Sequence, residues 1–102
     1  MDLNHAYLGT ELKYALNISA EGFSMAEDNF RVELKCGPRS IVLEKDDLTR
    51  DGEDNYYITF DSREIGPGRI TAIITAYVPD EDFEDGLRTE IAKVDLAYIK
   101  SI

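Results

Sequence analysis

A short acidic segment at residues 80–86 contains the side chains best suited to binding a cation. Five of its seven residues are acidic and the last is glycine: Asp80, Glu81, Asp82, Glu84, Asp85 and Gly86. Calcium prefers roughly six to eight oxygen ligands, which closely spaced carboxylates on a flexible loop can supply. The spacing is not that of an EF-hand, because the sixth and twelfth positions counted from Asp80 are Asp85 and Ile91, where the motif has glycine and glutamate. Asp80, Asp82 and Asp85 are therefore calcium candidates, but we favour a solvated loop that keeps a sheet edge unpaired, and we expect no metal site.

Phe83 is the apolar residue in the middle of this acidic segment. Its side chain either folds back over the core as a lid or stands out as an anchor for a contact. We expect the lid, because large apolar side chains gain free energy when they leave water. The segment as a whole is a candidate interaction site, in which we include Asp80, Glu81, Asp82, Phe83, Glu84 and Asp85.

Tyr56 and Tyr57 are neighbours in a stretch typical of a strand, and they are two of the six tyrosines in the chain. Successive side chains of a strand point to opposite faces, so one of the two must face solvent or a second layer. Tyrosine combines a large apolar ring with a polar tip and is enriched in interfaces and carbohydrate contacts. We therefore add Tyr56 and Tyr57 to the candidate interaction residues, although half-exposed strand tyrosines are equally common in isolated sandwiches.

The remaining reactive residues do not form a catalytic pattern. A second acidic stretch also carries basic residues and fits a solvated loop: Lys45, Asp46, Asp47, Arg50, Asp51, Glu53 and Asp54. With 21 acidic residues among 102, close carboxylate pairs arise from composition alone, so a hydrolase that uses two of them is a distant hypothesis. His5 is the only histidine, and nothing in the sequence places it beside Cys36, which closes an apolar strand face. We expect no enzyme activity, no catalytic residue and no cofactor.

Charge and composition limit the possible partners. Eleven basic and 21 acidic residues give a formal net charge of −10, which disfavours nucleic acid and anionic membranes because both carry negative charge themselves. The single cysteine excludes an internal disulfide and a cysteine-cluster metal site. No signal peptide and no apolar run of about 20 residues is visible, so we expect a protein that is cytoplasmic in the producing cell or associated with a virion. The expected contact is a protein partner, with self-association as one form of it.

The segment 69–78 has the strongest strand pattern in the chain. It is rich in β-branched residues, apolar or semi-apolar on both faces, and preceded by the turn Gly66-Pro67-Gly68. We expect it to be central, with shorter strands packed against it at 12–18, 30–36, 41–43 and 56–60 and a last long strand at 88–99. In the last of these we favour a strand over a helix because of its β-branched and aromatic content. We expect its inward face to consist of Ala92, Val94, Leu96 and Tyr98.

These elements predict an all-β fold, and more specifically an immunoglobulin-like antiparallel β-sandwich of about six to eight strands. A chain of 102 residues has the size of one domain, so 1–102 is expected to form a single sandwich, with 1–10 as a flexible arm. The chain has no tryptophan and one cysteine, so it lacks the Cys-Trp-Cys core of antibody domains.

Two parts of the sequence resemble small proteins of bacteriophages and of prophage-like or mobile elements of gut Bacteroidetes such as Bacteroides. The first part comprises 9–14 and 30–34, and the second comprises 65–72, 77–80 and 82–90. A polar alternating first strand, a charged middle loop and an Ile-Gly-x-Gly corner before a long strand together resemble the immunoglobulin-like N-terminal module of phage baseplate upper proteins. The resemblance implies a structural or attachment part of a virion, and it implies no particular site residues.

Three functional hypotheses are carried forward. The first is a non-enzymatic structural or interaction module in a phage- or prophage-derived, baseplate-like assembly, with the acidic segment as its recognition edge. The alternative is a calcium- or carbohydrate-binding β-sandwich of the cell surface. The distant third is the hydrolase, which needs two carboxylates with raised pKa values in a concave pocket.

Overall fold

The computed structural model describes residues 5–52 and 55–101 of the chain. These residues form eight strands, one α-helix and one 3-10 turn: β1 (His5–Tyr7), β2 (Glu11–Leu16), β3 (Phe30–Cys36), β4 (Arg39–Glu44), η1 (Lys45–Asp47), β5 (Thr49–Arg50), β6 (Tyr56–Asp61), α1 (Ser62–Ile65), β7 (Gly68–Pro79) and β8 (Leu87–Lys100). Strands account for 59% of the structure and helices for 7%, which confirms the predicted all-β class.

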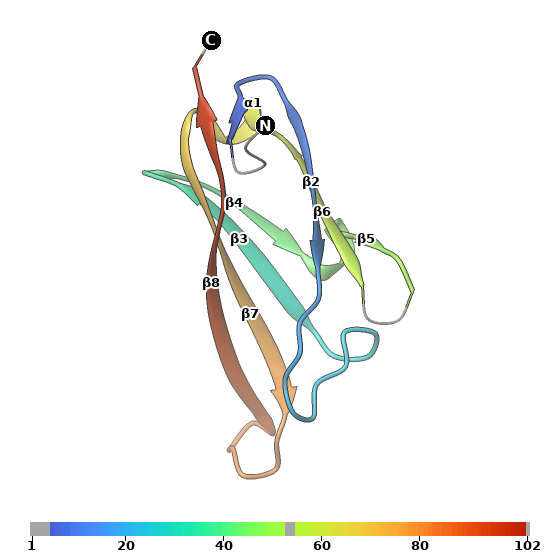
Figure 1. The fold of residues 1–102 in the computed structure, drawn as a ribbon. Coiled ribbons are helices and arrows are strands. Elements are labelled where there is room, and N and C mark those ends of the chain that lie inside the picture. The colour runs from blue at the N-terminus through green and yellow to red at the C-terminus, as the bar shows by residue number, and fades with distance from the viewer. Residues whose placement is uncertain (1–4, 53–54, 102) are drawn as a thin grey trace.

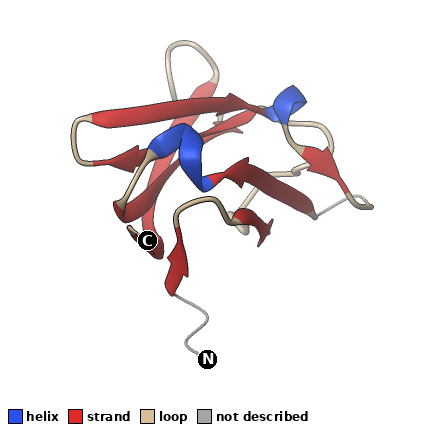
Figure 2. Cartoon of the chain, turned by 90° about the horizontal axis from the view of Figure 1, so that it is seen from above, coloured by secondary structure: helices blue, strands red, loops and turns tan. Residues whose placement is uncertain are grey.

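The strands are arranged in two sheets that face each other (Figures 1 and 2). The larger sheet has the order β1-β8-β7-β3-β4, and the smaller sheet has the order β2-β6-β5. Neighbouring strands run antiparallel except for β1, which is parallel to β8. The larger sheet is curled, and its long strands follow the longest dimension of a molecule that measures 50 × 29 × 22 Å (Figure 1).

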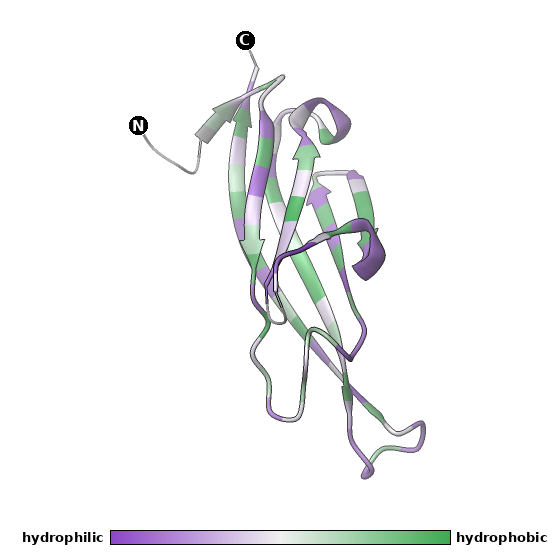
Figure 3. Cartoon of the chain, turned by 90° about the vertical axis from the view of Figure 1, so that its right-hand side faces the viewer, coloured by the Kyte–Doolittle hydropathy of each residue, from purple (hydrophilic) through white to green (hydrophobic). Residues whose placement is uncertain are grey.

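The core lies between the two sheets and is built by alternation along the strands. Every second residue is buried in the two best-patterned strands: Phe30, Val32, Leu34 and Cys36 in β3, and Tyr56, Ile58 and Phe60 in β6. Figure 3 shows the same alternation as apolar and polar bands along the ribbon. Because apolar burial contributes about 25 cal/mol per Å² of surface removed from water, this layer is the main source of stability.

Strand β7 is the middle strand of the larger sheet, which confirms the central position predicted for 69–78. It pairs with β8 on one side and with β3 on the other. Four of its core-facing residues are buried: Ile70, Ala72, Ala76 and Val78. Its pairing with β8 is the longest strand pairing among the described residues.

The inward face predicted for the last strand is wrong at its C-terminal end, because β8 contains a bulge. Ile70 pairs with Ala97 and Thr71 pairs with Asp95, so Leu96 has no opposite residue on β7. An extra residue in one strand reverses the faces beyond it. As a result Ala97 is buried, whereas the side chain of Tyr98 is 45% exposed.

Before the bulge, β8 keeps the predicted orientation but lacks the predicted burial. Val94 lies opposite Ala72, and Ala92 lies opposite Ile74, so both are on the core-facing side of the sheet. Both are nevertheless exposed. The smaller sheet therefore leaves this edge of the larger sheet uncovered.

The expected N-terminal arm falls partly outside the described residues, since 1–4 are not described. The next three, His5–Tyr7, form β1 beside the end of β8, and the Leu8 amide donates to the Lys100 carbonyl at 2.8 Å. The charged loop expected at 45–55 contains η1 and β5, and Glu53 and Asp54 lie outside the described part of the chain.

Candidate interaction site

The acidic segment forms the loop 80–86 between β7 and β8 and closes on itself through backbone hydrogen bonds. The Asp80 amide donates to the Gly86 carbonyl at 2.9 Å, and the Gly86 amide donates to the Phe83 carbonyl at 2.9 Å. The Phe83 amide in turn donates to the Asp80 carbonyl at 3.3 Å. The loop lies at the end of the molecule far from the C-terminus (Figure 1). It is therefore a shaped turn that projects from one end of the sandwich.

Two of the loop carboxylates hold the backbone of the turn. Asp80 Oδ1 accepts a hydrogen bond from the Asp82 amide at 3.0 Å, and Asp85 Oδ1 accepts one from the Leu87 amide at 3.0 Å. The hydrogen bond from the Asp82 amide and that from the Arg88 guanidinium lower the pKa of Asp80 from its usual value. These carboxylates act as turn-forming side chains, as short acidic residues do in Asx turns.

Arg88 connects the acidic loop to the connection between β2 and β3. One of its guanidinium nitrogens donates to Asp80 Oδ2 at 2.6 Å, and the other donates to the backbone carbonyl of Glu21 at 3.1 Å. Glu21 belongs to the connection between β2 and β3. A charged hydrogen bond of this kind is stronger than a neutral one. Arg88 therefore holds two loops together at the same end of the sandwich.

The structure does not gather the calcium candidates into a binding site. Asp80 is turned toward Arg88 and the Asp82 amide, and Asp85 is turned toward the Leu87 amide. Over residues 5–52 and 55–101, no three His, Cys, Asp or Glu side chains lie together in a group that could hold a metal ion. The carboxylates that are close in the sequence therefore accept hydrogen bonds from different groups and do not converge on one point.

The expectation that Phe83 folds back as a lid is wrong. Its side chain is 47% exposed. It lines an open, shallow depression whose walls come from the loop and the start of β8: Phe83, Glu84, Asp85, Leu87, Arg88 and Thr89. The loop lies beyond the ends of the other strands at this end of the molecule (Figure 1). Phe83 is therefore an exposed aromatic ring in a loop that carries five carboxylates.

The two candidate tyrosines lie on opposite faces of β6, as predicted, and only one of them is accessible. Tyr56 is buried, its ring meets that of Phe30 edge-on at 5.1 Å, and its hydroxyl donates to the Met25 carbonyl at 3.4 Å. Tyr56 is therefore a core residue. It belongs to the smaller sheet, whereas the acidic loop belongs to the larger.

Tyr57 lies on the outer face of the smaller sheet and has partners within the chain. Lys13 Nζ lies 4.2 Å from the centre of its ring, and its hydroxyl donates to Asp51 Oδ2 at 3.2 Å. That hydrogen bond to a carboxylate raises the pKa of Tyr57, because ionisation would bring two negative charges together. The structure therefore does not bring Tyr56 and Tyr57 together with loop 80–86 into one surface.

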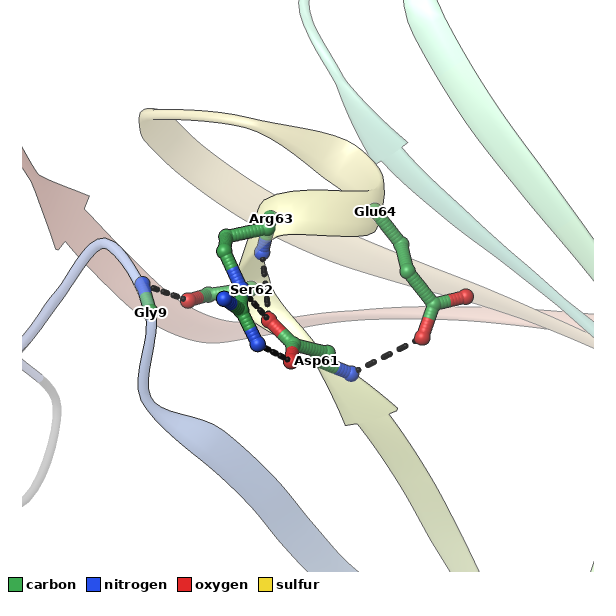
Figure 4. A network of polar contacts seen from close by, with 5 residues as sticks. All are labelled: Gly9, Asp61, Ser62, Arg63 and Glu64. Carbon is green, nitrogen blue, oxygen red and sulfur yellow. Dashed lines mark hydrogen bonds and ion pairs between the residues drawn. The ribbon is translucent and has the colours of Figure 1, made fainter.

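A polar network at α1 was not singled out in the sequence, although its pattern was visible there. The Asp61 carboxylate accepts from the Arg63 amide at 2.9 Å and pairs with its guanidinium at 2.6 Å, while Glu64 Oε1 accepts from the Asp61 amide at 3.1 Å (Figure 4). Asp61 and Glu64 form a capping box, whose signature is an acidic or hydroxyl residue followed three positions later by glutamate. The buried Ser62 hydroxyl accepts from the Gly9 amide at 2.8 Å (Figure 4). The network joins α1 to the segment before β2 and has a structural role.

Acid should reduce the contribution of the Asp61 charge to the stability of the fold. The hydrogen bonds and charge of Arg63 lower the pKa of Asp61 from 3.8 to about 2. A depressed folded-state pKa gives stability that is present above the unfolded value and is lost as the pH falls through the folded one. We expect Asp61→Asn to be less stable than the wild type near neutral pH, and we expect this difference to shrink as the pH falls from about 4 toward 2. Urea unfolding of both proteins between about pH 6 and pH 2 measures this gap, and a gap that stays constant contradicts the assignment.

Comparisons with known proteins add no relative for this chain. No protein-family model matches it, and neither the curated proteins nor the solved structures contain a significant match. Within the described part of the chain, no helix is long and apolar enough to cross a membrane.

Proposed function

We propose that this chain is a non-enzymatic interaction module that binds a protein partner through the acidic loop 80–86. The observation that carries the proposal is Phe83, a large aromatic ring held 47% exposed in the middle of five carboxylates. Exposing such a ring costs free energy that a contact recovers. Aromatic anchors surrounded by polar residues are the usual centre of an interface.

The order of the loop supports this function. Its turns are closed by backbone hydrogen bonds, and Asp80 and Arg88 attach it to the sheet. A loop that is already shaped loses less conformational entropy on binding than a mobile one. Loops positioned by a rigid sandwich are also a common place for recognition residues.

The charge of the loop indicates the chemistry of the partner. Five carboxylates lie within six residues, in a chain with a net charge of −10. A basic surface with an apolar pocket would complement both the charge and the Phe83 ring. Complementary charge accelerates association and excludes acidic competitors.

Two carboxylates have pKa values that do not suit the acid role of a hydrolase. Asp61 and Asp80 have clearly shifted pKa values, and both shifts are downward because each carboxylate accepts hydrogen bonds from an arginine and from backbone amides. A general acid at neutral pH needs a raised pKa. These two residues are therefore unsuited to the acid role of a hydrolase.

We also propose that the sandwich is of the immunoglobulin-like type. In that fold the C, F and G strands share one sheet, often with C′, and the B, E and D strands share the other. The orders β4-β3-β7-β8 and β2-β6-β5 correspond to C′-C-F-G and B-E-D. The resemblance to baseplate modules extends the proposal to a structural component of a phage- or prophage-derived assembly.

Affinity capture tests the proposed function. The immobilised chain is used to capture proteins from the producing cells, and the affinity of the captured partner is then measured for wild type, Phe83→Ala and Val42→Ala. Val42 is a matched control, since its side chain is also 47% exposed and lies on β4 at the opposite edge of the larger sheet.

We expect Phe83→Ala to weaken binding by about 30-fold or more, as for a hot-spot residue worth about 2 kcal/mol. Val42→Ala should bind as the wild type does. Equal affinity for the wild type and Phe83→Ala would refute the loop as the binding surface.

A further inference from the structure

Most of strand β8 is a free edge. The strand has 14 residues, and β1 pairs only with Tyr98, Ile99 and Lys100 at its end. Among the described residues, no strand lies beside the remaining part of β8 on the side away from β7. An unpaired edge presents a row of backbone donors and acceptors that another strand can use.

Exposed apolar side chains are concentrated on this strand and its loop. Seven large hydrophobic residues are exposed in the described chain, and five of them belong to β8 or to loop 80–86: Phe83, Leu87, Ile91, Val94 and Tyr98. Ile91 is the most exposed of all at 65%. The other free edge of the same sheet, β4, carries one, Val42. A long edge with clustered apolar side chains marks a site of strand pairing.

We propose that β8 pairs antiparallel with β8 of a second copy of this chain, about a two-fold axis perpendicular to the sheet. The two five-stranded sheets would then join into one sheet of ten strands. This inference goes beyond the proposed function, because it concerns the edge of β8 and assigns it a different partner.

The bulge and the pleat restrict the register of such a pair. Residues that lie opposite each other in paired strands share one face of the sheet. A two-fold pair must therefore be centred on a residue, so that each core-facing side chain lies opposite another core-facing side chain. Centring the pair on Glu90 or Lys93 would place like charges directly opposite each other, which is unfavourable. Centring it on Ile91 places the most exposed apolar residue against its own copy.

The Ile91-centred register also gives acceptable neighbours along the strand. It pairs Thr89 with Lys93 of the second copy, and Arg88 with Val94 of the second copy. In this register the paired part of β8 ends at Asp95, directly before the bulge at Leu96. The pairing between the two copies therefore does not involve the irregular part of the strand. A register centred on Ala92 would instead place Ile91 opposite Lys93 of the second copy.

The charge distribution selects the antiparallel orientation. The five carboxylates of loop 80–86 precede β8, whereas Lys100 is the last residue of the strand. An antiparallel pair places the acidic loop of each copy level with the lysine-bearing end of the other. A parallel pair would place two five-carboxylate loops side by side, where they would repel. The second copy therefore brings Lys100 level with each acidic loop, which an acidic strand of another protein would not do.

Cysteine trapping tests the pair at residue level. On a two-fold axis only the central residue meets its own copy, with Cβ atoms about 4.5–5.5 Å apart. Ile91→Cys should therefore form disulfide-linked dimers under mild oxidation, within the reach of a disulfide after small adjustments. Thr89→Cys should not, because its two copies would be separated by four residues of strand, roughly 13 Å. Val42→Cys is the control on the other edge, and the buried Cys36 is present in all variants.

Solution mass provides the second measurement. Light scattering over a wide range of concentration should show a wild-type dimer, and Ile91→Lys should raise the dissociation constant at least about tenfold by placing two ammonium groups at the axis. Val42→Lys should leave the dimer unchanged. The circular dichroism spectrum and melting temperature of both variants should match those of the wild-type monomer, since both side chains are exposed.

Three outcomes would overturn the pairing. They are a wild type that is monomeric at every concentration, equal trapping of Ile91→Cys and Val42→Cys, or a dimer that Val42→Lys dissociates and Ile91→Lys does not. Ile91→Lys leaves loop 80–86 intact, so its affinity for the captured partner reports on the proposed function separately from the dimer.

Discussion

Replacing Phe30 with alanine is expected to lower the free energy of unfolding by about 3–5 kcal/mol. The side chain is completely buried at the start of β3 and lies between the two sheets. It meets the ring of Tyr56 at 5.1 Å and that of Phe23 at 6.3 Å, both edge-on. Alanine would lose the transfer free energy of the ring and the aromatic contacts, and it would leave a cavity that a close-packed core fills only in part.

Urea unfolding followed by circular dichroism measures this loss, since the chain has no tryptophan for fluorescence. Phe83→Ala is a matched control, because it removes the same atoms from an exposed position and should change stability by less than about 0.5 kcal/mol. A total stability of about 5–15 kcal/mol is usual for a domain, so Phe30→Ala should unfold at markedly lower urea. Equal losses for the two substitutions would contradict the placement of the core.

Local alternation predicts the strands of this fold well wherever one face is buried. The apolar positions of 30–36 keep a strict period of two, and the structure has β3 at Phe30–Cys36. The long β-branched segment at 69–78 similarly predicts β7 and its central position. In both cases the signal is a property of the segment itself: alternation in the first, and β-branched apolar content in the second.

The bulge in β8 could not be predicted in the same way, because it depends on pairing with β7. Two alternating sets in the last strand are apolar, one containing Leu96 and Tyr98 and the other Ala97 and Ile99. Either set can face the core, and the sequence contains no break where the faces exchange. Strand β1 has the same difficulty, because three residues are too few for a pattern and its partner is distant in the sequence.

The amino-acid composition predicted where the candidate site lies, but not the contacts that give the site its shape. Five carboxylates and a phenylalanine identify loop 80–86, but the use of Asp80 and Asp85 as turn acceptors depends on backbone geometry. The exposure of Phe83 depends on where the core ends. Tyr56 and Tyr57 are correctly placed on opposite faces, yet their distance from the loop follows from which sheet β6 joins.

Both proposed surfaces lie on the same hairpin of the larger sheet. Loop 80–86 connects β7 to β8, and the free edge begins at the residue after the loop. The β7–β8 pairing therefore fixes the position of the charged loop relative to the apolar edge. A homodimer through β8 would present two acidic loops at opposite ends, which is an arrangement suited to linking two partners in an assembly.

Replacing Gly66 with alanine is expected to lower the free energy of unfolding by about 1–3 kcal/mol. Gly66 ends α1 with φ 89° and ψ 179°, a backbone conformation open to glycine and strained for residues with a side chain. It is buried, and its amide donates to the Ser62 carbonyl at 2.8 Å. The chain must keep this conformation, because the next residues turn into β7.

A second effect at Gly66 must be separated from the backbone strain. A Cβ atom at this position would collide with the guanidinium of Arg39. That group is the end of a flexible side chain and can move away, so we expect the backbone to account for most of the loss. The double variant Arg39→Ala/Gly66→Ala removes the collision and keeps the strain. Measured by urea unfolding, it should remain less stable than Arg39→Ala by nearly the full Gly66→Ala difference. Recovery to the stability of Arg39→Ala would show that the collision, and not the backbone, requires glycine here.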